Sequence, residues 1–90
     1  MPKSVDANQP EIVAALRAVG ATVQHLHEVG RGCPDILVGF RQRNYLLEIK
    51  NCLRDWKLTP AEEIWLVQWR GQACVVETAD EALRAVGAVR

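Results

Sequence analysis

Apolar residues recur along the chain at intervals that predict an alternation of helices and strands. In the segment 9–19 they come three or four positions apart, as on one face of a helix. Polar and apolar residues alternate over 21–26, which predicts a short strand. Two apolar runs of strand length, 36–40 and 45–50, stand on either side of the polar segment 41–44. Two such runs joined by a short polar turn predict a β-hairpin.

Residues that favour helix caps mark the start of each predicted helix. Asn8 precedes a proline and a glutamate, which predicts Asn8 as the N-cap of the first helix. Thr59-Pro60-Ala61-Glu62 is a capping box with proline at the first helical position, and it opens a helix that runs to about Arg70. Thr78-Ala79-Asp80-Glu81 is a second capping box and opens a last helix.

One further strand is predicted over 73–76, between the last two helices. The element order is therefore αβββαβα. Strands that precede and follow a helix in this way predict an α/β fold with a mixed β-sheet flanked by helices. The 90 residues correspond to a single domain over 1–90.

Composition narrows the class of protein. Hydrophobic residues make up 49% of the chain, which is ordinary for a folded domain. A domain this small has a small core, so we expect stability to come in part from oligomerisation. The chain has three cysteines and no Cys-x-x-Cys pair, so we expect neither a disulfide framework nor a zinc site. Such a cysteine content favours a protein of the reducing cytoplasm. No long apolar run occurs, so we expect no signal peptide and no membrane span.

Two acids and a lysine interrupt the apolar pattern of the predicted hairpin. Asp35 comes immediately before its first strand, and Glu48 and Lys50 lie in its second strand. Side chains alternate along a strand, so Glu48 and Lys50 share one face. Charged groups beside a core are costly unless they are paired or coordinated. The three residues are therefore a candidate site, although exposed strand charges are the simpler interpretation of Glu48 and Lys50 taken alone.

The spacing of these residues resembles the signature of the PD-(D/E)XK nuclease superfamily. Gly32-Cys33-Pro34-Asp35, an apolar strand, and then Leu47-Glu48-Ile49-Lys50 is similar to the pattern of the VRR-NUC (virus-type replication-repair nuclease) family, in its stand-alone phage and bacterial form. The resemblance extends from about Glu11 to Val76, and Leu58-Thr59-Pro60 stands where the family begins a helix. It implies a PD-(D/E)XK nuclease-like core and a metal-dependent DNA endonuclease.

The resemblance also implies roles for individual residues. Asp35, Glu48 and Lys50 would be catalytic, and Asp35 and Glu48 would bind Mg²⁺ or Mn²⁺ with the backbone carbonyl of Ile49. Such ions stabilise the charge of a phosphodiester transition state and activate water. The first helix would add an acid near the metal, Glu11, with Gln9 as the alternative. Glu11 also sits where a capping carboxylate would.

Several other residues have both a functional and a structural interpretation. Glu62 stands where the family usually has glutamine, so it is either a helper at the site or only part of the capping box. We expect structural or surface roles for His25 and His27, because nothing completes a zinc site with them. Trp65 and Trp69 are one helical turn apart, which favours core or dimer packing over base stacking.

The zero net charge of the chain argues against a simple nucleic-acid coat protein but leaves local basic segments. The candidate phosphate contacts are Arg31, Arg41, Arg43, Arg54 and Lys57. Stand-alone members of the family are thought to be homodimers that act like Holliday junction resolvases, and a two-fold dimer suits paired cuts in a four-way junction. The alternatives are a dimeric module that binds branched DNA without cutting it, and a restriction or nicking endonuclease.

Overall fold

The computed structural model describes residues 7–89 and contains the helices and strands that the sequence predicts. The element order αβββαβα and the α/β fold with a mixed sheet flanked by helices are confirmed. In chain order the elements are α1 (Gln9–Ala18), β1 (Thr22–His25), β2 (Ile36–Phe40), β3 (Arg43–Ile49), α2 (Pro60–Gln68), β4 (Cys74–Val76) and α3 (Ala79–Ala85).

The four strands form one sheet in the order β1-β2-β3-β4. β1 pairs with β2 and β2 with β3 in antiparallel fashion, whereas β3 and β4 are parallel. The β2–β3 hairpin is tighter than predicted, because β3 begins at Arg43 and only two residues form the turn. Arg41 and Gln42 make this possible by adopting positive φ angles of 51° and 68°, as two-residue hairpin turns require.

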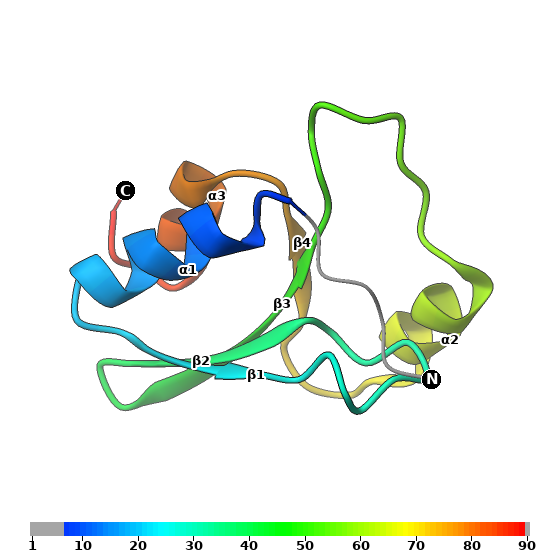
Figure 1. The fold of residues 1–90 in the computed structure, drawn as a ribbon. Helices are drawn as coiled ribbons and strands as arrows, with labels where there is room; N and C mark the ends of the chain where they lie inside the picture. The colour runs from blue at the N-terminus through cyan, green and yellow to red at the C-terminus, as the bar shows by residue number, and fades with distance from the viewer. Residues whose placement is uncertain (1–6, 90) are drawn as a thin grey trace.

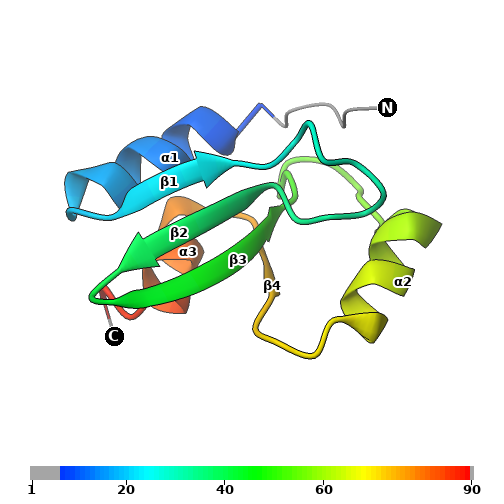
Figure 2. The same cartoon turned by 90° about the horizontal axis from the view of Figure 1, so that it is seen from below.

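Helices α1 and α3 lie side by side over one face of the sheet (Figure 1). The apolar residues of this face meet them in the core, because β-strand side chains alternate and every second residue points to the helices. Ile36, Val38, Leu47 and Ile49 supply the sheet side of this core, and all four are buried. Figure 2 looks onto the opposite face of the sheet, with α1 and α3 behind the sheet and α2 beside its end.

Helix α2 stands apart from the other two helices, beside the end of the sheet (Figures 1 and 2). Its one buried residue is Glu62, so the helix contributes no apolar side chain to the core. Of the two kinds of packing predicted for Trp65 and Trp69, core packing is therefore wrong, and packing in a dimer stays a prediction. Their rings stack on each other instead, with centroids 4.6 Å apart, and Trp69 keeps 45% of its surface exposed.

Two of the three predicted caps differ from expectation. The Thr59–Glu62 capping box of α2 is complete. At α3, Thr78 accepts the Glu81 N–H, but the Glu81 carboxylate accepts the N–H of Glu77 rather than that of Thr78. Asn8 is the N-cap residue of α1, as predicted, but its side chain makes no capping hydrogen bond and its backbone is already helical, with φ −85° and ψ −5°.

No helix within residues 7–89 combines the length and the apolar character needed to cross a membrane.

Candidate active site

Asp35 and Glu48 lie at the same end of the β2–β3 hairpin. The strand register ends with Ile36 opposite Leu47, and the N–H of Asp35, the residue before β2, donates to the carbonyl of that same Leu47 at 3.1 Å. Asp35 is 1% exposed and Glu48 is 2% exposed. The hairpin therefore brings together two buried carboxyl groups that are 13 residues apart in sequence.

Hydrogen bonds from two sides hold Asp35 in place. Its Oδ2 atom accepts the Ile49 N–H at 2.6 Å, and its main-chain carbonyl accepts the Leu26 N–H at 2.8 Å. The carboxylate is thus attached to β3 while its backbone is attached to the loop that follows β1. A carboxylate that is fixed by backbone groups on rigid strands is well suited to hold a ligand in one geometry.

Lys50, the last residue of the predicted motif, contacts Glu48 and also a residue of α2. Its Nζ atom lies 3.6 Å from Oε2 of Glu48 and 2.7 Å from Oε1 of Glu62 on α2. Glu48 and Lys50 therefore share one face, as the sequence predicts. Glu62, proposed from the sequence as a possible helper, contacts the lysine directly. The contact also attaches the first turn of α2 to the end of β3.

Gly32 brings the loop before Asp35 against α2. It has a φ of +83°, which favours glycine, and a Cβ atom at this position would overlap the carbonyl group of Ala61. The loop over 30–32 therefore packs on the first turn of α2 at van der Waals distance. Gly32 thus allows the loop before Asp35 to approach the helix turn that carries Glu62, the partner of Lys50.

The first helix directs Gln9 inward and Glu11 outward. Gln9 is 1% exposed, and its Nε2 atom lies 3.1 Å from Nδ1 of His25. Glu11 is exposed and lines a surface depression that Asn51 and Thr78 also line. Of the two first-helix candidates, the structure turns Gln9 toward the interior.

Asn8 positions the start of α1 beside the candidate site. Its Nδ2 group donates to the carbonyl of Lys50 at 3.0 Å and to the carbonyl of Glu77 at 2.8 Å. These two carbonyls follow the ends of β3 and β4, which lie side by side. The sequence around Asn8 predicts only a helix cap, because its partners are 42 and 69 positions away and leave no local pattern.

The five candidate phosphate contacts fall into two groups. Arg41 and Arg43 are at the β2–β3 turn, roughly 16 Å from Asp35 at about 3.3 Å per strand residue. Arg41 is also held to the protein, because it donates to the Gly87 carbonyl at 3.4 Å and lies over the Phe40 ring.

The other three basic residues are in loops at the end of the sheet where Asp35 and Glu48 lie. They are exposed, and Figure 2 shows these loops at the opposite end from the β2–β3 turn. They are Arg31, Arg54 and Lys57. These three residues, unlike those of the hairpin turn, are therefore at the same end of the sheet as the candidate site.

The donor set fits a hard divalent cation. Within residues 7–89, no three His, Cys, Asp or Glu side chains gather into a ready metal-binding group. Mg²⁺ does not need such a group, since it commonly uses one or two carboxylates and completes its coordination with water and substrate oxygens. Asp35 and Glu48 supply the two carboxylates. His25 and His27 are edge to face, 5.9 Å apart, and do not form a metal cluster.

Comparison with models of protein families, with curated proteins and with solved structures gives no significant match to this chain. The arrangement of its own residues therefore has to support any functional assignment. Its most specific feature is that Lys50 contacts two buried carboxyl groups, those of Glu48 and Glu62, while the buried Asp35 carboxylate is bonded to the neighbouring Ile49 N–H.

Proposed function

We propose that this protein is a metal-dependent, structure-specific DNA endonuclease with a PD-(D/E)XK nuclease-like core, similar to the VRR-NUC family. The observation that carries the proposal is that Asp35 and Glu48 are both buried at one end of the hairpin, where Asp35 accepts the N–H of Ile49, next to Glu48, and Lys50 lies 3.6 Å from Glu48. Two carboxylates and an ammonium group in this arrangement have little structural benefit, because burying charges costs more than most ion pairs return. Their cost is accounted for if they serve catalysis.

Each residue has a distinct role in this proposal. Asp35, Glu48 and the Ile49 carbonyl would hold Mg²⁺ or Mn²⁺, which stabilises the charge of the phosphodiester transition state and lowers the pKa of the attacking water. Lys50 donates hydrogen bonds to that water or to the scissile phosphate. Glu62 positions Lys50 through the 2.7 Å contact. Arg31, Arg54 and Lys57 contact the neighbouring phosphates.

The proposed substrate is branched DNA, such as a four-way junction, bound by a homodimer. Helix α2 supports this proposal, because Ile64 and Val67 are 57% and 80% exposed and no part of the described chain covers them. A second copy that packs on this face would place two sites close to one two-fold axis, since α2 also carries Glu62. Paired cuts in a junction of two-fold pseudo-symmetry need such an arrangement.

One observation favours the alternative, a non-cleaving module that binds branched DNA. Lys50 already contacts Glu48 and Glu62, and Asp35 already accepts a backbone hydrogen bond. Groups that satisfy one another in this way also occur in purely structural ion-pair clusters. The two candidates differ in whether the phosphodiester bond is cut.

A cleavage assay decides between them. Labelled four-way junction, flap and linear duplex are incubated with Mg²⁺, with Mn²⁺ and with EDTA. Lys50→Ala removes the lysine, and Asp35→Asn retains an oxygen that can accept the Ile49 N–H. Asp80→Asn, an exposed acid on α3, is the matched control.

We expect metal-dependent cutting of the junction that falls at least about 100-fold in Asp35→Asn, given the 10- to 100-fold losses seen for supporting residues of metal sites. Junction binding should persist in this variant, and Asp80→Asn should cut normally. Tight junction binding without any cutting by the wild-type protein would establish the binding module instead.

A further inference from the structure

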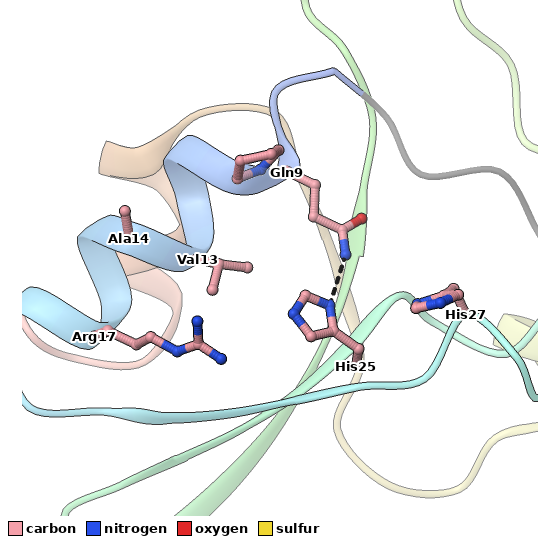
Figure 3. A pocket seen from close by; sticks show the side chains of 7 residues that line it. Gln9, Val13, Ala14, Arg17, His25 and His27 are labelled. Atoms are coloured by element: carbon pink, nitrogen blue, oxygen red, sulfur yellow. Dashed lines mark hydrogen bonds between the residues drawn. The ribbon is translucent and has the colours of Figure 1, made fainter.

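A cavity lies on the core side of the sheet, between α1 and the end of β1. Its volume is about 360 Å³, which is within the size range of small-molecule sites, and Figure 3 shows side chains that line it. Its lining residues come from three successive turns of α1 and from the segment over 25–27. The proposed nuclease site does not use this cavity.

The walls of the cavity suit a flat, aromatic ligand. Pro10, Val13 and Ala14 form an apolar side on α1, and the His25 ring lies across from them (Figure 3). The slot is therefore apolar on one side and aromatic on the other. Nucleobases stack on aromatic side chains because each base has a π-face, whatever its sequence identity.

Polar groups stand at the end of the cavity near Gln9. The Gln9 amide nitrogen lies 3.1 Å from Nδ1 of His25, which is hydrogen-bond distance. The Oε1 atom of Gln9 is buried and has no hydrogen-bond partner among residues 7–89, and the same holds for Nδ1 of His27. Buried polar atoms are nearly always paired in native proteins, so these two atoms point to a missing partner.

We propose that the cavity receives one unstacked nucleobase of the bound DNA. The ring would fill the slot, and its edge would meet the polar atoms of Gln9 and His27. Arg17 extends along the same cavity (Figure 3) and would contact the phosphate of that nucleotide. An aliphatic ligand would leave the two polar atoms unpaired, and a bare phosphate would face mainly apolar walls.

The position of the cavity links it to the candidate active site. Asn8 immediately precedes Gln9, and its side chain bonds the Lys50 carbonyl. A base held at Gln9 would therefore belong to a nucleotide close to the scissile phosphate. Branch points supply such unpaired bases, and removing a base from a duplex costs unstacking energy. The inference rests on the proposed function only in that the protein must bind DNA.

The test measures binding in EDTA, where no cutting interferes. Fluorescence anisotropy compares a labelled junction or flap that has unpaired bases at the branch with the same DNA carrying abasic sites there. Ala14→Leu fills the cavity. Ala18→Leu makes the same change one turn further along α1, at an exposed residue that does not line the cavity.

We expect the abasic DNA to bind the wild-type protein about 5- to 100-fold more weakly, as for the loss of one stacked base. Ala14→Leu should weaken binding of the base-bearing DNA by a similar factor and make the abasic sites inconsequential, because the two changes remove the same contact. Ala18→Leu should behave as the wild type. Circular dichroism confirms that the variants are folded.

Equal binding of base-bearing and abasic DNA by the wild-type protein would overturn the proposal, even if Ala14→Leu fails to fold. A deoxynucleoside monophosphate that binds the wild-type protein but not Ala14→Leu, while DNA binding is the same in both, would assign the cavity to free nucleotides and overturn its role in DNA binding. Base-dependent binding without any cutting would support the cavity and reject the nuclease. Metal-dependent cutting together with equal binding of base-bearing and abasic DNA would support the nuclease and reject the role of the cavity.

Discussion

The Nζ atom of Lys50 lies 2.7 Å from the Oε1 atom of Glu62, and the same oxygen accepts the N–H of Thr59 at 2.9 Å. One carboxylate oxygen therefore caps the first turn of α2 and pairs with the lysine of the candidate site. The start of α2 and the end of β3 are held together through this atom. Changes at Glu62 should thus affect both the stability of the protein and the position of Lys50.

Variants of the capping box separate these two effects. Thr59→Ala removes only the cap and should lower the free energy of unfolding by about 1 kcal/mol. Glu62→Ala also removes a buried partner of Lys50 and should cost about 3 kcal/mol or more. Glu62→Gln retains an oxygen for the Thr59 N–H and should fall between them. Urea unfolding measures the three values, and equal losses in Thr59→Ala and Glu62→Ala would show that the lysine contact contributes nothing.

The close approach of Gly32 to α2 gives a second prediction. Gly32→Ala and Gly20→Ala both place a side chain at positive φ, which costs about 1–2 kcal/mol. Only at Gly32 does the new methyl group overlap a backbone carbonyl, that of Ala61, whereas Gly20 has open space around it. Thermal unfolding should therefore show a clearly larger loss for Gly32→Ala, and junction cutting should fall in that variant alone. A loss no larger than that of Gly20→Ala would mean that the loop and α2 move apart easily.

The exposed apolar face of α2 predicts the effect of a charge at Val67. If a second copy covers this face, Val67→Glu buries an unpaired carboxylate in the interface and should convert the dimer to a monomer. Val19→Glu introduces the same charge at an exposed residue at the C-terminal end of α1, and it should leave the dimer intact. Sedimentation velocity at several protein concentrations measures both masses. A wild-type protein that is monomeric throughout would reject the homodimer.

Cys74 should make stability depend on pH in the alkaline range. Burial, with the negative charge of Glu81 as a second cause, raises the pKa of the Cys74 thiol above its ordinary value of 9.0. The folded protein then keeps the thiol proton when the unfolded chain has lost it, so this contribution to stability is complete below about pH 9 and declines above it. The thermal midpoint of the wild type should fall relative to that of Cys74→Ala as the pH rises above 9.

Because the wild type and Cys74→Ala differ only at residue 74, the difference between their thermal midpoints removes the effect of the other titrating groups. The difference between their midpoints should be constant from pH 7 to 8.5. The exposed thiol of Cys52 should also react with iodoacetamide before Cys74 does at pH 8, because the thiolate is the nucleophile. A midpoint difference that does not change up to pH 10.5 would contradict the prediction.

Local patterns in the sequence were sufficient for the elements and for part of the candidate site. The hairpin strands, the Thr59–Glu62 capping box and the shared face of Glu48 and Lys50 depend on residues close together in the chain. Strand alternation and helix capping act over one to four residues, so they can be read without knowing the fold.

Contacts between distant segments could not be read in this way. Asn8 matches the pattern of an N-cap but bonds Lys50 and Glu77, and Trp69 matches a buried stripe but remains largely exposed. In both cases the local signal is correct for a helix in isolation. The surroundings of the helix decide which partner the side chain takes.

Local sequence patterns were enough to place the strands and helices, and Glu48 on the same face as Lys50, because backbone geometry repeats with a fixed period. Three other contacts came only from the folded arrangement: Glu62 contacts Lys50, Gly32 packs on Ala61, and Gln9 meets His25 at a cavity. These contacts join segments that are 12 or more residues apart in the chain. Which distant segments meet depends on how the whole core packs, and no local pattern records that outcome.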